Sequence, residues 1–397
     1  MDFDVVVIGA GPAGLSFARA LSVGEAGAGQ TPLRIALIES QPEATLASPA
    51  FDGREIALTH FSARVLSELG LWDRFPADAV SPLRDAKVLN GLSLHGMNIE
   101  HRHGNKDELG YLISNHLIRK AAYEVVKDSP NVTLICDAKV TDLRTDADGG
   151  QVTMADGKTL RASLVVAADS RFSAARRAMG ISARMHDFGK VMMVCQMEHD
   201  EPHEHVAWEW FDYGQTLALL PMNGNRSSVV LTLPQHEMQP LEAMSAAAFN
   251  DAITARFARR LGDMRLTSTR HCYPLVAVYA DRFVGKRFAL MGDAAVGMHP
   301  VTAHGFNFGL KGADTLARGM LKARASGSDF ASPAVLQAYE STHRRATLPL
   351  YLATHAVAKL YTSESLPSRV LRDAFLGIGQ RLTPFKRLVA ASLTGAH

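Results

Sequence analysis

The sequence predicts an α/β protein (α+β as a whole) in which a Rossmann-like domain carries an inserted, mainly antiparallel β domain and precedes a helical C-terminal region. Three observations support this fold class. The β-branched run Asp4 to Ile8 leads through a glycine-rich turn into a helical pattern, as a buried parallel strand leads into its crossover helix. Strand-like runs at Val191 to Met197, Thr216 to Leu220 and Ser228 to Leu233 mark the inserted domain. Leu348 to Leu360 has helical periodicity.

Composition and charge exclude several classes of protein. The 397 residues include 42 Lys and Arg against 40 Asp and Glu, and this net charge of +2 offers no general basic face to a nucleic acid. Three scattered cysteines are too few for a disulfide framework or a thiolate metal site. No apolar run approaches the roughly 18–20 residues that span a bilayer, and Asp2 and Asp4 stand where a secretory signal carries positive charge. We therefore expect a cytoplasmic protein of about two or three domains.

The turn after the first strand has the sequence G-x-G-x-x-G, from Gly9 to Gly14, with Pro12 and Ala13 inside it. The first glycine allows a tight turn, the second lets the backbone approach a pyrophosphate, and the third lets the helix pack closely on the strand. The helical pattern that follows offers free N–H groups and the positive end of a dipole to phosphates. Because the motif lies between a strand and a helix, it predicts a dinucleotide site.

The second strand, Arg34 to Ile38, ends on Glu39. An acidic side chain at this position can accept hydrogen bonds from both ribose hydroxyls of an adenosine. The interval from the glycine motif is lengthened by an insertion at Gly24 to Thr31. Strand, turn, helix, strand and acid together indicate a dinucleotide, without deciding between NAD and FAD.

Two later strands also end in acidic residues. Leu164 to Ala168 is a buried run followed by Asp169, and Arg287 to Met291 leads into Gly292-Asp293. A strand that ends in Gly-Asp places a carboxylate where it can hold a ribityl or ribose hydroxyl. The loop that begins at His299-Pro300 then opens a helix, whose positive dipole end would lie beside an electron-accepting ring.

These signatures, in this order, resemble those of the single-component FAD-dependent aromatic hydroxylases of the p-hydroxybenzoate hydroxylase type, and the resemblance covers essentially the whole chain. Within that family the chain is similar to the ubiquinone-biosynthesis hydroxylases, demethoxyubiquinone 5-hydroxylase-like members above all. The closer similarity is carried by residues 52–58, 109–115, 217–222 and 299–310. The resemblance implies FAD as the cofactor and NADH or NADPH as the co-substrate.

The resemblance also implies roles for individual residues. Those assigned to FAD binding are Gly9, Gly11, Pro12, Ala13, Gly14, Glu39, Arg54, Asn115, Asp169, Gly292, Asp293, Gly305, Phe306 and Asn307. Pro300 and His304, on the loop that would face flavin and substrate, are the candidates for a catalytic contribution. No metal site is expected.

Two positions depart from the family pattern. The Asp-Gly motif, which is linked to FAD and NAD(P)H handling, is Asp169-Ser170 here, so its backbone must avoid positive φ or bear a cost of about 1 kcal/mol. The usual Gly-Gln-Gly before the flavin helix is Ala303-His304-Gly305, which brings a titratable side chain to the isoalloxazine. We expect these departures to affect how the protein uses the nicotinamide co-substrate and how it modulates the flavin. We expect FAD binding to be retained.

The predicted domains are discontinuous in the sequence. Residues 1–75, 97–180 and 272–340 are expected to form the FAD-binding domain, with 76–96 and 181–271 as the substrate domain. Residues 341–397 form the helical C-terminal region. The active site is expected between the sheet of the substrate domain and the flavin.

The family chemistry belongs mainly to the cofactor. The resemblance implies that NAD(P)H reduces the flavin, and that O2 adds at the flavin C4a carbon to give a hydroperoxide. This species hydroxylates an electron-rich polyprenyl phenol or quinol ring in ubiquinone biosynthesis. Three alternatives stay open: a soluble aromatic-acid hydroxylase of the same mechanism, an O2-independent FAD-dependent isoprenoid reductase, and an FAD-bound scaffold of a biosynthetic complex. The sequence identifies no base for the phenol proton.

The C-terminal region has two interpretations. Between Arg344 and His397 there are eight Lys and Arg against two acids, with an apolar helical periodicity. Such a helix favours a peripheral contact at the inner face of the membrane and association with other ubiquinone-biosynthesis proteins. The alternative is a helical cap packed on the FAD domain.

Two further patterns are set aside. Three histidines between residues 199 and 205, together with the acids around them, could form a metal site. The stretch is, however, typical of a solvated polar loop between two strands. Trp208-Glu209-Trp210 resembles the start of the W-x-W-x-I-P motif of flavin-dependent halogenases, but Asp212 and Tyr213 replace its Ile and Pro. Trp208 and Trp210 are instead expected to face one packed surface.

Overall fold

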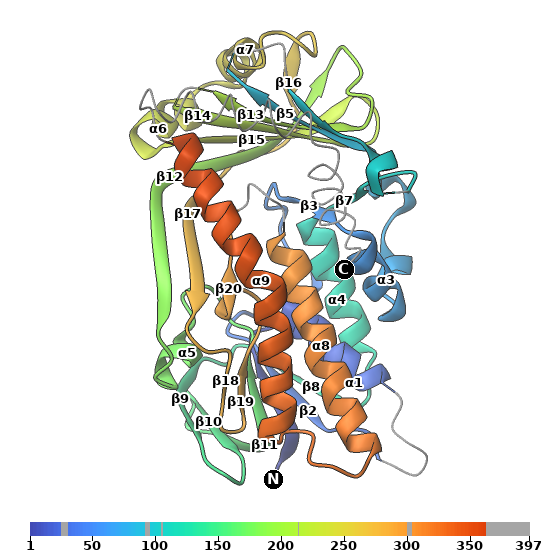
Figure 1. Ribbon diagram of the computed structural model, residues 1–397, viewed down its shortest axis with the longest axis vertical. Helices are drawn as coiled ribbons and strands as arrows, with labels where there is room; N and C mark the ends of the chain where they lie inside the picture. Colours follow the sequence, from blue (N-terminus) through green and yellow to red (C-terminus); the bar gives the residue numbers. More distant parts are fainter. Residues whose placement is uncertain (25–30, 92–95, 105, 213, 300–303, 363–397) are drawn as a thin grey trace.

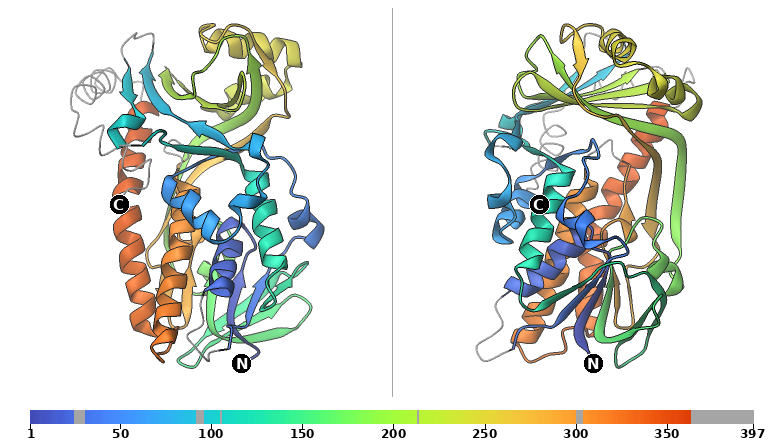
Figure 2. Two further views of the ribbon diagram at one scale, coloured as in Figure 1. Left: turned by 90° about the vertical axis from the view of Figure 1, so that its right-hand side faces the viewer. Right: turned by 180° about the vertical axis from the view of Figure 1, so that it is seen from behind.

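The computed structural model describes residues 1–24, 31–91, 96–104, 106–212, 214–299 and 304–362. These residues form an elongated molecule with a mainly parallel sheet toward one end and a second sheet across the other (Figures 1 and 2). Helices pack along the first sheet, and a small third sheet lies between the two larger ones. The predicted combination of a Rossmann-like domain and an added antiparallel sheet is confirmed.

The first sheet is built around the N-terminal strand, whose last four residues are fully buried. β1 pairs in parallel with β2 on one side and β11 on the other, and these strands are continuous apolar runs because both faces of the sheet are covered. The strands, in order across the sheet and followed by the two at its side, are β18 (Val284–Gly285), β19 (Phe288–Leu290), β11 (Thr159–Ala167), β1 (Phe3–Ile8), β2 (Ile35–Ile38), β8 (Val132–Ile135), β10 (Gly150–Met154) and β9 (Val140–Thr145).

The helices near the first sheet bury their apolar faces on it and on one another. α1 contacts both α4 and α8, and α9 runs alongside α8 (Figure 1). The helices are α1 (Pro12–Val23), α2 (Glu43–Ala47), α3 (His60–Glu68), α4 (Asn115–Lys127), α5 (Ala174–Ala178), α8 (Gly305–Ala325) and α9 (Pro333–Thr362), with short 3-10 turns η1 (Trp72–Arg74), η2 (Ala77–Ala79), η3 (His101–Gly104) and η4 (Gly292–Ala294). Within these ranges, no helix combines the length and apolar character needed to cross a bilayer.

The second sheet is mainly antiparallel, and the predicted strands at Val191, Thr216 and Ser228 all lie in it. α6 (Gln235–Ala243) and α7 (Ala246–Arg256) cover its outer face (Figure 1). Its strands, in order, are β20 (Val296–Gly297), β17 (His271–Ala280), β12 (Ala183–His199), β15 (Arg226–Pro234), β14 (Gln215–Pro221), β13 (Val206–Asp212), β5 (Asp85–Asn90) and β6 (Met97–Ile99), with β16 (Met264–Leu266) beside β12. The third sheet is β3 (Glu55–Leu58), β7 (Gly110–Ser114) and β4 (Ser81–Leu83).

Strands cross the predicted domain boundaries. β12 and β17 pair antiparallel over most of their length, and this pair runs from the region of the first sheet into the second sheet (Figure 1). The boundary at residue 272 therefore falls inside β17. β6, which the prediction assigned to the FAD-binding domain, pairs with β5 in the second sheet. The division into domains stays a prediction. The predicted boundaries near residues 97 and 272 cut across paired strands, because the sequence does not display which strands pair.

Candidate functional site

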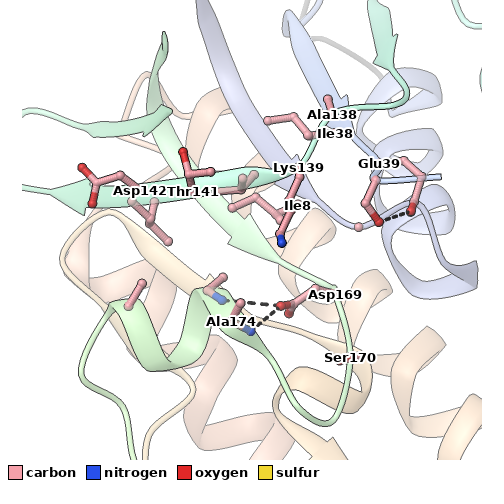
Figure 3. Close-up of a pocket in the computed structure, with 16 residues that line it drawn as sticks. Ile8, Ile38, Glu39, Ala138, Lys139, Thr141, Asp142, Asp169, Ser170 and Ala174 are labelled. Atoms are coloured by element: carbon pink, nitrogen blue, oxygen red, sulfur yellow. Dashed lines mark hydrogen bonds between the residues drawn. The ribbon is translucent and has the colours of Figure 1, made fainter. Parts of the chain in front are cut away.

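A cavity of about 310 Å³ lies at the carboxyl ends of β1, β2 and β11. Glu39 and Asp169 lie on two of its sides, and Lys139 reaches into it (Figure 3). Gly9, at the end of β1, also lines it. The crevice outside the carboxyl ends of parallel strands is where open α/β sheets bind nucleotides, so the predicted dinucleotide residues meet at the expected edge.

The glycine motif has the geometry that its residue types require. Gly9 has a φ of +104°, and a Cβ there would lie 2.6 Å from the carbonyl oxygen of Ala168. A Cβ on Gly14 would lie 2.0 Å from the carbonyl oxygen of Gly9, so only glycine lets α1 pack this closely on β1. A Cβ on Gly11 would meet nothing within 4 Å. Pro12 and Ala13 begin α1. The open space at Gly11, beside the free N–H groups of the helix, fits a pyrophosphate.

Glu39 is held in place by the backbone. Its Oε2 accepts a hydrogen bond from the Ala10 N–H at 2.8 Å, and its Oε1 accepts one from the Gln41 N–H at 3.0 Å. A carboxylate has about four lone-pair positions, so both oxygens keep acceptor capacity toward the cavity. This arrangement fits the hydroxyls of an adenosine ribose.

Asp169 presents an unsatisfied acceptor at the same cavity. Its Oδ2 accepts a hydrogen bond from the Ala174 N–H at 2.9 Å, whereas its buried Oδ1 has no partner in the described part of the chain. Buried polar atoms without partners are uncommon, and this one is placed to accept a hydrogen bond from a ligand. Ser170 is not among the described residues with positive φ, so the Asp-Ser departure avoids the backbone cost.

The Gly292-Asp293 segment is tied to the loop after β11. Arg171 donates from Nη2 to Asp293 Oδ2 at 2.8 Å and from Nη1 to the Val276 carbonyl at 3.0 Å. Gly292 has a φ of +57°. Arg176 donates to the Ala294 carbonyl at 2.8 Å. The sequence pattern had not indicated Arg171, which fixes the orientation of the Asp293 carboxylate.

Arg54 and Asn115 come together on one carboxylate. Asp52 Oδ2 accepts hydrogen bonds from Arg54 Nη2 at 2.5 Å and from Asn115 Nδ2 at 2.7 Å. Burial opposes ionisation of Asp52, but the hydrogen bonds and charge of Arg54, with the Asn115 amide, hold its pKa below the ordinary value. The Arg54 guanidinium also lies over the Tyr273 ring, 5.3 Å from its centre. These two predicted FAD contacts thus form one cluster, organised by Asp52.

The N-terminus of α8 carries the predicted flavin-facing residues. A Cβ on Gly305 would meet nothing within 4 Å, which leaves room next to the helix N-terminus. Asn307 accepts a hydrogen bond from the Thr59 N–H at 3.1 Å and donates one to the Ala57 carbonyl at 2.8 Å, so its amide anchors α8 to β3. Phe306 packs against the main core, and His304 is buried beside the Phe308 ring. Pro300 lies outside the described residues.

The patterns that were set aside have structural roles. His199 Nε2 contacts Ser227 Oγ at 2.9 Å, and His203 Nε2 contacts the Met222 carbonyl at 2.8 Å. Both histidines are buried, so the expectation of a solvated loop is wrong for them, because protein groups replace water as their hydrogen-bond partners. Trp208 and Trp210 pack on one apolar cluster, as predicted.

The inner face of the second sheet looks toward the N-terminal end of α8 (Figure 1). On its outer face, Trp210, Leu217 and Leu231 are buried under α6 and α7. At the centre of the inner face the side chains are only half-buried; they are Val88, Glu209, Ala218, Leu220 and Val230. The middle strands of this sheet therefore keep partly exposed side chains on the face toward the N-terminal end of α8.

Comparisons with known proteins identify the family to which the chain belongs. The family model of the FAD binding domain matches residues 2–349. The ubiquinone hydroxylase UbiM of Neisseria meningitidis is 46% identical over 396 residues, covering 99% of this chain and 84% of the relative. The ubiquinone hydroxylase UbiL of Rhodospirillum rubrum is 36% identical over 389 residues, covering 97% and 88%. The crystal structure of p-nitrophenol 4-monooxygenase PnpA from Pseudomonas putida shares the fold, with a TM-score of 0.76 at 20% identity, over 100% of this chain and 99% of that one.

The predicted cofactor is therefore confirmed as FAD, and the predicted class as a monooxygenase. The chain belongs to the FAD-binding domain family, in the branch of FAD-dependent monooxygenases that contains the ubiquinone hydroxylases.

Proposed function

We propose that the protein hydroxylates an electron-rich polyprenyl phenol or quinol ring in ubiquinone biosynthesis, with O2 and NAD(P)H as co-substrates. The observation that carries this proposal is the 46% identity to a ubiquinone hydroxylase along 99% of the chain. The partly exposed side chains on the inner face of the second sheet, opposite the N-terminus of α8, support a ring-binding site there.

FAD would be held by the residues around the cavity and along the two later loops. Gly11 and the N-terminus of α1 would receive the pyrophosphate, Glu39 the adenosine ribose, and Asp293 the ribityl region. Gly305 would leave room for the isoalloxazine beside α8. Bound there, FAD supplies the activation of O2 and the transfer of one oxygen atom to the ring.

The charge of the inner face distinguishes a neutral phenol or quinol from an aromatic acid. Among the five central residues, Glu209 is the one ionisable residue, and none is Lys or Arg. Arg226 is exposed at the start of β15, and Lys190 donates to the Gly214 carbonyl at 3.1 Å at the other end of the face. A carboxylate-bearing ring would meet no Lys or Arg among these central residues to pair with its charge, which disfavours the aromatic-acid alternative.

The test is turnover of a demethoxyquinol with a short isoprenoid tail by the purified yellow protein, with NADH and with NADPH. Under 18O2 we expect a product heavier by one labelled oxygen atom. The matched comparison is the same ring carrying a carboxylate, which should react much more slowly. Faster reaction of the acid would replace the quinol proposal with the aromatic-acid alternative. Reduction of an isoprenoid double bond without O2 consumption would support a reductase, and bound FAD without turnover would support a scaffold.

We also propose a peripheral membrane contact through the C-terminal region. α9 itself packs on the core, because Tyr339 and Tyr351 are buried and Tyr339 donates to the Leu290 carbonyl at 2.7 Å. A deletion should therefore begin after Thr362, so that α9 stays intact. We expect the shortened protein to retain FAD and to lose binding to anionic vesicles; unchanged vesicle binding would contradict this proposal.

A further inference from the structure

Glu209 lies at the centre of the inner face of the second sheet. On β13 it stands in register with Val88 of β5 on one side and with Ala218 of β14 on the other. Its chain neighbours Trp208 and Trp210 point outward into the cluster under α6 and α7. Successive side chains of a strand point to opposite faces, so the Glu209 carboxyl points to the inner face, toward the N-terminal end of α8.

The surroundings of Glu209 are apolar but not closed. One buried cluster on this face includes Ala207 and Leu112, and a second includes Val194 and Leu275. Val88 packs against the first cluster and Val230 against the second, whereas Ala218 belongs to neither, and both Ala218 and Glu209 are half-buried. The carboxyl thus stands between two packed regions, at a place where protein side chains leave the face partly uncovered.

Glu209 also has no hydrogen bond or ion pair with any residue in the described ranges. Burial alone raises the pKa of its carboxyl to about 8. A structural carboxyl inside a protein is normally paired, because an unpaired one costs stability. A perturbed and unpaired carboxyl facing a substrate region is typical of a functional residue.

The other charged or titratable groups presented to this region are engaged elsewhere. Glu55 of β3 accepts hydrogen bonds from Ser114 and Gln196, and His271 of β17 contacts Thr269. Three further groups make hydrogen bonds to backbone carbonyls: Tyr273 to Asp52, Lys190 to Gly214 and Arg226 to Asn223. Their charges do not contribute to the raised pKa of Glu209.

We propose that Glu209 is the catalytic residue that accepts the hydroxyl proton of the phenol or quinol ring during hydroxylation. This inference rests on the proposed function. As the ring O–H bond breaks, its electron pair raises the electron density at the ortho and para carbons, and the proton goes to the carboxylate. After the new C–O bond forms, the proton on that carbon is lost to water and the aromatic ring is restored, and Glu209 returns its own proton to the ring oxygen.

The balance of the reaction needs no further reagent. The ring C–H, O2, NAD(P)H and one proton become ring C–OH, water and NAD(P)+. O2 is the oxidant and NAD(P)H the reductant, as in the proposed function, while Glu209 is unchanged at the end. Because the carboxylate form is the base, the hydroxylation rate should rise with pH through about 8.

The experiment compares Glu209→Gln, which keeps the shape and removes the base, with Glu55→Gln, which changes a half-buried carboxyl that has hydrogen-bond partners. Both are assayed as FAD-loaded proteins with the short-tailed demethoxyquinol. We expect Glu209→Gln to lower the hydroxylation rate by about 10²–10⁴-fold and to remove the rise through pH 8, with an unchanged flavin spectrum. Glu55→Gln should keep the pH profile. If Glu209→Gln does not fold, Glu209→Asp, which keeps a shorter carboxylate, should give an intermediate rate with the same profile.

Two further measurements separate a base from a structural residue. Fluorine on the ring lowers the pKa of the substrate hydroxyl, so the ratio of wild-type to Glu209→Gln rates should shrink as fluorine is added. In the resting protein, an infrared carboxylic-acid band should titrate near pH 8 and be missing from Glu209→Gln. Wild-type turnover with an equal rate in Glu209→Gln would overturn the assignment of Glu209 alone. A wild type that hydroxylates neither phenol nor quinol would instead refute the proposed function.

Discussion

The cofactor edge of the first sheet and the inner face of the second sheet use carboxylates in opposite ways. At the cofactor edge, Glu39 and Asp169 are fixed by backbone N–H groups, so each points at the cavity in a defined geometry. On the inner face, Glu209 is surrounded by apolar side chains and has no partner in the described ranges. The first arrangement suits a resident ligand that is held in one position. The second suits a substrate that brings its own hydroxyl and leaves after reaction.

The largest expected effect tests the close packing at the cofactor edge. Gly14→Ala places a Cβ 2.0 Å from the Gly9 carbonyl oxygen, so α1 must move away from β1, and we expect a loss of about 3 kcal/mol in the free energy of unfolding. Gly11→Ala is the matched control, because the same atom meets nothing within 4 Å there. It should unfold like the wild type in urea but bind FAD more weakly. Equal stability of the two variants would show that the packing distance does not limit the fold.

The next effect concerns the resident ligand itself. Glu39→Gln keeps the shape of the side chain but replaces one acceptor oxygen with a donor, so it cannot satisfy both backbone N–H groups and the ribose hydroxyls. Charged hydrogen bonds of this kind contribute about 2 kcal/mol, which predicts FAD affinity about 30-fold weaker. The measurement is titration of the FAD-free protein with FAD by fluorescence quenching. An unchanged dissociation constant would remove Glu39 from the ribose site.

The same contrast explains what the sequence could and could not predict. The glycine motif, Glu39 and Asp169 were predictable because each follows a recognisable buried strand, and the ends of parallel strands meet at one edge. Asp52 and Arg171 were not predicted as organising residues, since Asn115, which binds Asp52, and Asp293, which binds Arg171, are far away in the sequence. The same holds for the two crossed domain boundaries, which depend on pairing between distant strands.

Glu209 is the clearest example of a candidate site residue that could not be predicted from the sequence. It lies between two tryptophans, and the neighbouring residues do not indicate which face of the sheet α6 and α7 cover. Its environment depends on the pairing of β13 with β5 and β14, and on the half-exposed state of Val88 and Ala218. The signal available in the sequence was an acid flanked by residues that must be buried, which places the acid on the opposite face.

A smaller effect tests whether the Glu209 carboxyl on the inner face lowers the free energy of unfolding. The raised pKa of Glu209 means that the folded protein holds a proton that the unfolded chain has lost, so stability declines as pH rises from about 4.3 toward 8. Glu209→Gln removes this decline and should be more stable than the wild type at pH 8 by about 1–2 kcal/mol after allowance for solvent. Urea unfolding between pH 5 and pH 8.5 gives the two slopes. A variant that is less stable than the wild type at pH 8 would mean that Glu209 has a stabilising partner.

The smallest effect compares two neighbouring carboxyls between the two large sheets. The hydrogen bonds of Arg54 and Asn115 outweigh burial and lower the pKa of Asp52, so its contribution to stability is present above about pH 4 and is lost as pH falls. Burial raises the pKa of Glu55 despite hydrogen bonds from Ser114 and Gln196, so its contribution is lost as pH rises. Asp52→Asn should therefore cost about 1 kcal/mol at pH 7 and progressively less as the pH falls toward 3, whereas the stability of Glu55→Gln relative to the wild type should increase with pH. Urea unfolding at pH 3, 5 and 7 measures both, and parallel slopes for the two variants would show that Arg54 does not distinguish these carboxyls.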